Sequence, residues 1–327
     1  MGHRRLEITT ASTHLKAAFA ISRGAKTHAE TVRVTLREDG ATGRGESVPY
    51  GRFDETIQSV VAEIEAARAE IEGGISREAL QARMKPGAAR CAVDCALWDL
   101  EAKRAGKPVW QLAGLPEPKP VETAVTIGLD TPEAMAAAAQ AAPGRLLKVK
   151  LGGPEDLARI EAVHEARPEA RLIVDANEGL DAADLPALSR RAEVLGVVLI
   201  EQPFPAGKDA ALMKRPGAVA ICADESAHTS ADIQTLARSY DAVNVKLDKA
   251  GGLTEALAMV REARGAGMGV MVGCMVAGSL SMAPAVLLAQ LADAADLDGP
   301  LWLASDIEDG LAYADGFVSP PGAGLWG

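Results

Sequence analysis

The pattern of apolar and polar positions changes character about a third of the way along the chain. From about residue 120 onward, short apolar runs recur with helix-like segments between them, which is typical of strands alternating with helices. Eight runs are expected as strands, over residues 121–129, 146–150, 171–175, 197–200, 219–223, 242–246, 268–272 and 295–297. Eight alternating units predict a parallel (β/α) barrel. An open doubly wound sheet is the main alternative, but the glycine-rich turn with which such sheets bind dinucleotides is not found.

The N-terminal third follows a different pattern. Residues 4–13 and 30–37 alternate apolar and polar side chains, as half-exposed strands do, and Glu38-Asp39-Gly40 predicts a turn into a third strand over 44–48. The segment between the first two strands, residues 18–25, is predicted to be a surface loop that carries Arg23. Helices are expected over 54–72 (with Asp54 as N-cap), 76–84 and 87–104. Strands followed by helices predict an α+β domain.

A proline-rich segment separates the two patterns and is the clearest boundary in the chain. It reads Leu115-Pro116-Glu117-Pro118-Lys119-Pro120. We therefore expect an α+β domain over residues 1–117 and a catalytic barrel over residues 118–304. Residues 305–327 form a tail rich in glycine and proline, which we expect to pack back on the first domain.

The composition narrows the classes of function. The net charge of -11 and the absence of a basic stripe argue against binding to nucleic acid or to an anionic membrane. No apolar run reaches the roughly 18 residues that a membrane-spanning helix needs. The four cysteines are interpreted as buried thiols, because nothing in their spacing suggests a disulfide framework. We therefore expect a cytoplasmic protein that acts on a small molecule.

Polar side chains stand at the ends of successive predicted strands, where barrel enzymes place their chemistry. They are Lys150, Asp175, Glu201, Asp224 and Lys246, each 22 to 26 residues after the one before. Because this interval is about one β/α unit, we expect the five residues at equivalent places around the barrel mouth. The three carboxylates would repel one another unless a cation joins them. Oxygen-only ligands favour Mg²⁺, with Mn²⁺ as the alternative.

Lys148 and Lys150 are two residues apart in one predicted strand, so their side chains should point to the same face. Two ammonium groups about 6 Å apart, at an effective dielectric constant near 20, repel by roughly 3 kcal/mol, or about 2 pKa units. We predict that this repulsion lowers the pKa of one lysine and makes it a usable base. A site that removes a proton gains from this arrangement, whereas a structural sheet does not.

Four further polar residues near the strand ends have two interpretations each. Asn177 and Glu225 follow the predicted metal ligands, and either support those ligands or cap the next helix. Asp296 and Asp298 are expected on one strand face, where they either cap a loop or bind a cationic group of the substrate. The five histidines show neither metal-ligand spacing nor a nucleophile beside them, and we expect them at the surface.

Together these segments resemble the enolase superfamily, in its muconate-lactonizing subgroup. The matching segments are Lys148-Val149-Lys150, Asp175-Ala176-Asn177, Glu201-Gln202-Pro203, Asp224-Glu225-Ser226 and Lys246-Leu247-Asp248-Lys249-Ala250-Gly251-Gly252. The resemblance covers nearly the whole chain and implies a modified (β/α)7β TIM-type barrel with an N-terminal α+β capping domain that carries specificity loops. Within the subgroup the chain is most similar to the dipeptide epimerases, through Asp296-Leu297-Asp298 and Ile21-Ser22-Arg23-Gly24.

The resemblance implies a role for each matching residue. It implies a Mg²⁺ site made by Asp175, Glu201 and Asp224. It implies acid/base roles for Lys150 and Lys246, and an electrostatic contact from Lys148 to the substrate carboxylate. It also implies that Asp296 and Asp298 bind the α-ammonium group of a dipeptide, and that Arg23 binds the side-chain carboxylate of its glutamate.

The implied reaction is a 1,1-proton transfer at the α-carbon of the C-terminal residue, from L-Ala-D-Glu to L-Ala-L-Glu, in the recycling of murein peptides. One alternative is an o-succinylbenzoate synthase or cycloisomerase, which also uses the paired lysines but has no reason to keep an ammonium clamp. The other is a non-enzymatic binding protein, which has no reason to keep a complete set of lysines and ligands. The oligomeric state stays open, a homo-oligomer included.

Overall fold

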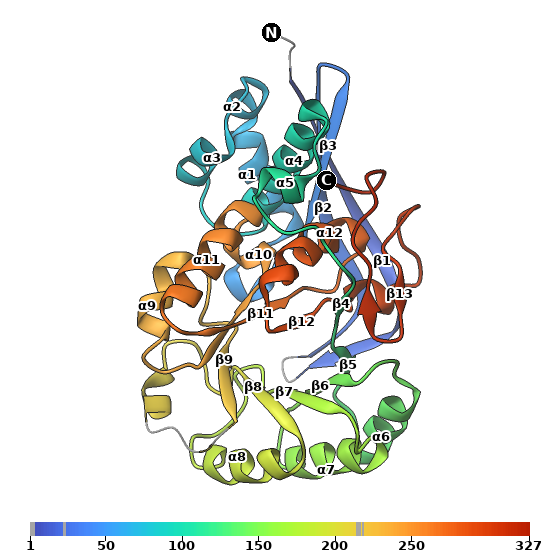
Figure 1. The fold of residues 1–327 in the computed structure, drawn as a ribbon, viewed down its shortest axis with the longest axis vertical. Coiled ribbons are helices and arrows are strands. Elements are labelled where there is room, and N and C mark those ends of the chain that lie inside the picture. The colour runs from blue at the N-terminus through green and yellow to red at the C-terminus, as the bar shows by residue number, and fades with distance from the viewer. Residues whose placement is uncertain (1–3, 22–23, 214–216, 218) are drawn as a thin grey trace.

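The computed structural model describes residues 4–21, 24–213, 217 and 219–327. It combines an N-terminal antiparallel sheet, covered by helices, with an eight-stranded parallel barrel (Figure 1). The predicted fold class, a TIM-type barrel with an N-terminal α+β domain, is confirmed. Within the described part of the chain, no helix has both the length and the apolar character needed to cross a membrane.

The N-terminal domain is built on a three-stranded sheet of β1 (Arg5–Ile21), β2 (Gly24–Glu38) and β3 (Ala41–Ser47). The hairpin of β1 and β2 runs down to the middle of the barrel (Figure 1). The helical elements that follow are η1 (Gly51–Phe53), α1 (Ile57–Ala66), α2 (Arg68–Glu72), α3 (Arg77–Arg83), α4 (Ala88–Ala105) and α5 (Val109–Leu112). Helix α4 lies directly on β3, where Gly45 permits the approach: a Cβ atom there would be 2.7 Å from the Ala96 nitrogen.

The barrel strands are β5 (Val125–Ile127), β6 (Leu146–Lys150), β7 (Arg171–Asp175), β8 (Val197–Glu201), β9 (Ala220–Ala223), β10 (Ala242–Val245), β11 (Gly269–Gly273) and β12 (Ala294–Asp296). They are hydrogen-bonded in sequence order from β5 to β12, and each pair is parallel. The last gap is bridged where the Ala124 nitrogen donates to the Ala295 carbonyl at 2.8 Å. The eight strands thus form a closed ring around one interior.

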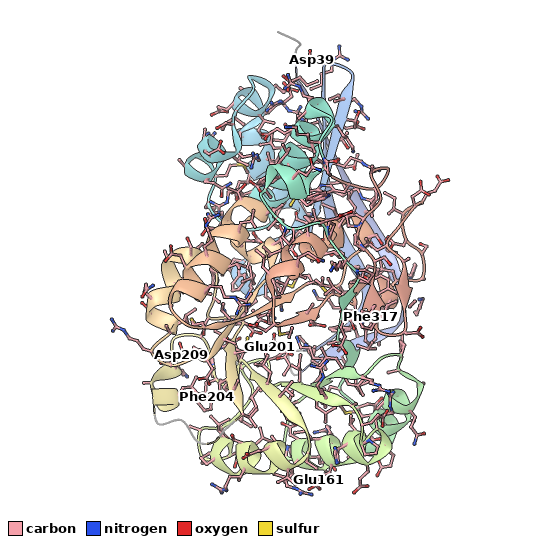
Figure 2. All side chains as sticks on the ribbon, viewed as in Figure 1. Asp39, Glu161, Glu201, Phe204, Asp209 and Phe317 are labelled. Atoms are coloured by element: carbon pink, nitrogen blue, oxygen red, sulfur yellow. The ribbon has the colours of Figure 1, made fainter. Side chains whose placement is uncertain are left out.

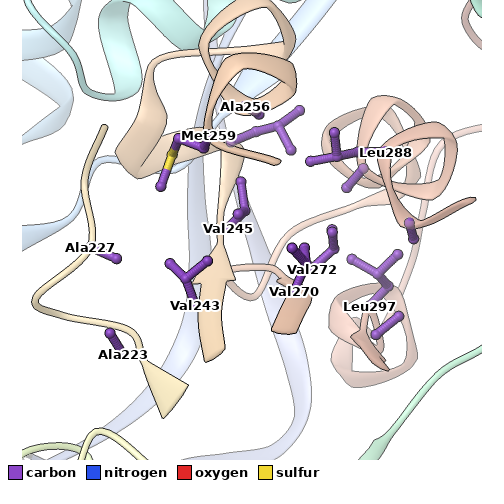
Figure 3. Packing of buried hydrophobic residues seen from close by; sticks show 14 of the residues in the cluster. Ala223, Ala227, Val243, Val245, Ala256, Met259, Val270, Val272, Leu288 and Leu297 are labelled. Atoms are coloured by element: carbon purple, nitrogen blue, oxygen red, sulfur yellow. The ribbon is translucent and has the colours of Figure 1, made fainter. Parts of the chain in front are cut away.

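Helical segments surround the strands, at the positions that the alternating pattern predicts. They are α6 (Pro132–Ala141), α7 (Asp156–Ala166), α8 (Leu185–Val194), η2 (Asp209–Met213), η3 (Ser230–Asp232), α9 (Ile233–Leu236), α10 (Leu247–Ala250), α11 (Leu253–Gly265), α12 (Ser279–Leu288), η4 (Ala289–Leu291) and η5 (Gly299–Trp302). Valines of β10 and β11 pack outward against α11 and α12 (Figure 3). This outer layer leaves alternate strand positions to face the interior.

The barrel interior has an apolar floor below a charged layer. The floor is a cluster of buried residues from successive strands: Ala124, Leu146, Ile173, Leu199, Cys222, Ala242 and Met271. Two residues further along their strands, on the same face, lie Lys148, Asp175, Glu201, Asp224 and Asn244. The period of two therefore places each of these five polar residues two positions after a buried apolar residue on the same strand face.

The C-terminal residues return to the N-terminal domain. Trp326 Nε1 donates to the Cys95 carbonyl of α4 at 3.1 Å, and the Gly327 nitrogen donates to Asp99 Oδ1 at 2.8 Å. On the way, β13 (Tyr313–Ala314) and β14 (Phe317–Val318) form a small sheet with β4 (Val121–Glu122).

Two local expectations for the N-terminal domain are wrong. Residues 54–72 do not form one helix: the chain bends at Ala67 between α1 and α2, and Thr56 caps α1 by accepting from the Ser59 nitrogen at 3.0 Å. Asp54 instead adopts a left-handed conformation after η1, with a φ of 59°. The predicted loop over 18–25 is also mostly strand, because β1 and β2 continue pairing across a register shift after His14.

Candidate active site

A cavity of about 840 Å³ opens where the carboxyl ends of the barrel strands meet the β1–β2 hairpin. Lys148, Lys150, Asn177, Asp224, Lys246, Cys274, Asp296 and Asp298 line it from the barrel side. Residues of the hairpin and of the segment before η1, among them Phe19, Lys26, His28, Tyr50 and Arg52, line it from the other side. Most of the residues that the sequence singled out thus face one space. Glu201 lies at the centre of the barrel beneath them (Figure 2).

Lys148 lies at the bottom of this charged layer and is only 1% exposed. Its Nζ is 3.0 Å from Asp175 Oδ2, 2.8 Å from Glu201 Oε2 and 2.8 Å from Asp296 Oδ2. Burial by itself would lower the pKa of Lys148, but attraction to these carboxylates outweighs burial and raises the pKa well above its usual value. Lys148 is therefore a fixed positive charge.

The sequence predicted that repulsion lowers the pKa of one of the two lysines, and Lys148 is not that lysine, because its pKa is raised. The reason is that Lys148 has three carboxylates within 3.0 Å, contributed by β7, β8 and β12. Unlike charges at this distance outweigh a like charge at about 6 Å.

Lys150 and Lys246 stand at the rim of the same layer. Lys150 Nζ donates to Asp175 Oδ2 at 2.7 Å and to Asn177 Oδ1 at 3.3 Å. Lys246 Nζ donates to Asp224 Oδ2 at 2.7 Å. Burial disfavours the charge on Lys246, but attraction to Asp224 outweighs it, so the pKa of Lys246 is raised. Each lysine is thus anchored by its own carboxylate.

The three carboxylates lie at the ends of adjacent strands and differ in their surroundings. Burial favours protonation of Asp175 and Asp224, yet the neighbouring lysines outweigh it and hold the pKa of both below the usual range. Burial and the charge of Asp175 raise the pKa of Glu201 to about 7, with Lys148 only partly offsetting them. Glu201 Oε1 accepts from Asn244 Nδ2 at 2.8 Å.

The donor set of these carboxylates bears on metal binding. Among the described residues, no group of three or more His, Cys, Asp or Glu side chains surrounds a single point as metal ligands do. The carboxylate oxygens face lysine ammonium groups instead. Glu201 Oε2 is buried and is paired with the Lys148 ammonium group at 2.8 Å. Three carboxylate groups at the ends of adjacent strands nevertheless offer only oxygen donors, which is the donor chemistry that a hard divalent cation takes.

Asp296 and Asp298 are both buried but do not lie on one strand, so that expectation is wrong. β12 ends at Asp296, and Asp298 begins the turn into η5. Asp298 Oδ2 accepts from the Thr126 nitrogen at 2.7 Å and from Trp302 Nε1 at 3.2 Å. Burial, together with the charge of Asp296, raises the pKa of Asp298 to about 6. Asp296 Oδ1 has no hydrogen-bond donor in the described part of the chain.

Asn177 and Glu225 connect the two rims of the site. Asn177 Nδ2 donates to Glu225 Oε1 at 3.3 Å, while its Oδ1 accepts from Lys150. Both residues therefore contact the charged layer, and neither caps a helix through these bonds. The predicted substrate-binding Arg23 lies outside the described residues. In β1, the Phe19 ring centroid lies 4.8 Å from that of Trp302 and 5.9 Å from Lys150 Nζ.

Lys249 is part of the site, although the sequence did not single it out for a role. Its Nζ donates to Asp224 Oδ1 at 2.6 Å and also contacts the Asp224 carbonyl. The signal available in the sequence was its spacing, because Lys249 follows Lys246 by three residues and a helical turn brings such residues to one side.

Comparison with known proteins identifies the family. Residues 4–114 match the mandelate racemase / muconate lactonizing enzyme N-terminal domain, and residues 131–325 match the enolase C-terminal domain-like family. The chain belongs to the enolase superfamily. Its membership in the muconate-lactonizing subgroup, predicted from the strand-end residues, is confirmed.

Relatives within the enolase superfamily match over nearly the full length. The L-Ala-D/L-Glu epimerase of Escherichia coli strain K12 is 43% identical over 316 residues, which are 96% of this chain and 98% of that protein. A solved enolase family member from Agrobacterium tumefaciens, described as having homology to dipeptide epimerases and bound to sodium and L-Ala-L-Glu, is 51% identical with a TM-score of 0.96 over 99% of this chain and 100% of its own.

A more distant enolase-superfamily structure contains magnesium. The dipeptide epimerase of Cytophaga hutchinsonii, complexed with Mg and D-Ala-L-Val, is 28% identical with a TM-score of 0.91, over 98% of this chain and 94% of its own. The curated relatives that match this chain include epimerases and a racemase. The chain is accordingly an isomerase, as the sequence predicted.

Proposed function

We propose that this protein is a dipeptide epimerase that inverts the α-carbon of the C-terminal residue by 1,1-proton transfer, with L-Ala-D/L-Glu as substrate. The observation that carries the proposal is the placement of two lysines. Lys150 ends β6 and Lys246 follows β10, four strands further around a ring of eight, so they face the cavity from opposite sides. Two amines that flank one carbon are what inversion by proton transfer needs.

The two lysines would exchange roles with the direction of reaction. One removes the α-proton as a neutral amine, and the other delivers a proton to the opposite face as an ammonium group. A metal ion held by Asp224 would favour the neutral form of Lys246, because it would offset the carboxylate charge that raises the pKa of this lysine. Lys148 stays charged, and its place at the bottom of the layer suits it to bind the carboxylate next to the reacting carbon. Asp175 and Asp224 orient the two acid/base lysines.

We assign Asp175, Glu201 and Asp224 as the residues that would hold Mg²⁺, with Mn²⁺ as a substitute. Their oxygen-only donor set and their places at the ends of adjacent strands support this assignment. The bound ion would supply positive charge that stabilises the negative charge developing on the substrate carboxylate as the α-proton leaves. Asn177 and Glu225 would support the site, because the Asn177 side chain accepts from Lys150 and donates to Glu225.

Two features support a dipeptide as the substrate. Asp296 and Asp298 place buried carboxyl groups beside the cavity, and Asp296 Oδ1 is free to accept from an α-ammonium group. Lys26 of the hairpin also lines the cavity and adds positive charge that would suit an acidic side chain of the substrate. An o-succinylbenzoate synthase or cycloisomerase would have no ammonium group to place there. Such a substrate suits murein-peptide recycling in the cytoplasm.

The test is exchange of the substrate α-proton in deuterated water, followed by proton NMR for L-Ala-L-Glu and L-Ala-D-Glu. Lys150→Ala and Lys246→Ala should each reduce epimerisation by at least about a hundredfold. Each variant should retain exchange from one epimer only, because one base is left. Lys107→Ala, which changes an exposed lysine far from the cavity, serves as the control. Wild-type turnover in either active-site variant, or no exchange with any dipeptide, would refute the proposal.

A further inference from the structure

Helix α10 (Leu247–Ala250) is a single turn that joins β10 to α11. It begins directly after Lys246, which is its N-cap, and it ends at Gly251, whose φ of 84° stops the helix. So short a helix has too few internal hydrogen bonds to fix its own position. Its neighbours on either side must therefore fix where Lys246 lies.

On the cavity side, α10 is tied to a single carboxylate. Lys246 at its start binds Asp224 Oδ2 at 2.7 Å, and Lys249 on its third position binds Asp224 Oδ1 at 2.6 Å. Lys249 also donates to the carbonyl of Asp224. Both carboxylate oxygens of Asp224 are thus bound from one turn of helix, so any displacement of α10 would move Lys246 and Asp224 together.

On the opposite side, α10 is bound by the N-terminal domain through Arg90 of α4. Arg90 Nη2 donates to the Ala250 carbonyl at 2.6 Å, and Arg90 Nε donates to the Gly251 carbonyl at 3.2 Å. These are carbonyls at the C-terminal end of α10, where a cation is favoured by the helix dipole. The packing is close, because a Cβ atom on Gly251 would lie 2.8 Å from Arg90 Nη2. A second tie runs from the Val48 nitrogen to Asp248 Oδ1, at 2.7 Å.

The surroundings of Arg90 suggest more than a contribution to stability. The guanidinium is buried, and among the described residues Glu255 and Asp94 act on its charge only from beyond ion-pair distance. Its other two hydrogen bonds also go to carbonyls, those of Gln81 and Met84. A buried charge is costly to desolvate, and an apolar residue of similar size often serves stability as well or better. What an apolar residue cannot do is hold two carbonyls of α10 at fixed points.

We propose that Arg90 is a positioning residue for proton transfer: by binding the end of α10 it fixes Lys246 and Asp224, although it contacts neither. The N-terminal domain would then affect the reaction in two ways: through the contact of Arg90 with α10, and through the β1–β2 hairpin that lines the cavity. The effect of Arg90 on proton transfer rests on the proposed function, in which Lys246 is an acid/base residue. The effect of Arg90 on metal binding depends only on the position of Asp224.

The experiment compares Arg90→Met and Arg90→Lys with the same two changes at Arg77. Arg77 lies in the same domain, 3.4 Å from the Trp98 ring centroid, and pairs with Glu101, but it makes no hydrogen bond to α10 in the described structure. Three quantities are measured for each variant: α-proton exchange from each epimer separately, the dissociation constant of Mn²⁺ by calorimetry, and the unfolding temperature. The single-lysine variants identify which epimer gives its proton to Lys246.

Arg90→Met should slow the exchange in which Lys246 is the base by about tenfold or more, relative to the exchange in which Lys150 is the base. The reason is that a small displacement of a base greatly lowers the rate of proton transfer. It should also weaken Mn²⁺ binding, with Arg90→Lys intermediate in both. The Arg77 variants should lower the unfolding temperature and leave the ratio of the two exchange rates unchanged. If Arg90→Met does not fold, Arg90→Lys decides by the same ratio.

An equal loss of exchange from both epimers, with unchanged Mn²⁺ affinity, would show a merely structural role and overturn the inference. If the wild-type protein exchanges no dipeptide proton at all, the proposed function fails instead. The Mn²⁺ affinities of the Arg90 and Arg77 variants then still decide whether Arg90 positions Asp224, and equal affinities would refute that.

Discussion

Asp94 should make the stability of this protein depend on pH in a direction opposite to that of most carboxylates. It is a buried residue of α4, and its oxygens accept from the Thr254 nitrogen at 3.0 Å, from Thr254 Oγ1 at 2.6 Å and from Gln81 Nε2 at 3.0 Å. Burial raises its pKa from 3.8 to about 6, although the bonds from Thr254 and the charges of Arg77 and Arg90 oppose the rise.

The sign and size of the effect follow from this shift in the pKa of Asp94. Between pH 4 and pH 6, approximately, the folded protein keeps a proton on Asp94 that the unfolded chain has already released. The contribution of Asp94 to stability therefore falls as the pH rises through this window, and the loss is absent below it. A shift from 3.8 to about 6 corresponds to about 3 kcal/mol in the free energy of unfolding.

The assay is urea denaturation of the wild-type protein and of Asp94→Asn at a series of pH values across this window, followed by circular dichroism. Asparagine cannot titrate, so the difference between the two proteins isolates Asp94 from other carboxyl groups such as Asp248. This difference should move by about 3 kcal/mol in favour of the variant as the pH rises. A constant difference, or one that moves in favour of the wild-type protein, would show that burial does not dominate at this site.

Two further predictions concern packing and the metal. Gly45→Ala would place a Cβ atom against the backbone of α4 and should cost about 1–3 kcal/mol or more in the free energy of unfolding, whereas Gly265→Ala, with nothing within 4 Å, should be neutral or stabilising; equal unfolding temperatures would contradict this. Removing divalent metal with EDTA should abolish α-proton exchange while the circular dichroism spectrum is kept, because Lys148 and Lys150 still bind the strand-end carboxylates. Added Mg²⁺ should restore exchange, and activity that survives EDTA would contradict the metal assignment.

The barrel strands and their polar ends were predictable because both are local signals. β6 and β7 have the bounds expected from the sequence, since each is a mainly apolar run that ends at a charged residue, Lys150 or Asp175. The interval of about one β/α unit then places the ends of neighbouring strands side by side without knowledge of any contact.

Other features depend on contacts that the sequence does not display. No glycine or proline marks the bend at Ala67, which is buried where α1 gives way to α2. The raised pKa of Lys148 depends on carboxylates from three other strands, whereas the sequence presented only its neighbour Lys150. The part played by Lys249 depends on the way that α10 turns it toward Asp224.

The alternation of side chains in β6 has a consequence for how such a protein can evolve. Leu146, Lys148 and Lys150 face the interior, and Leu147 and Val149 pack among the surrounding helices. Inserting or deleting one residue within this strand would exchange the two faces, driving ammonium groups into a dry layer. Changes in chain length are therefore expected in the loops that join strands to helices and not within a strand such as β6. A protein descended from this one can change its substrate specificity through these loops while its strands keep their length.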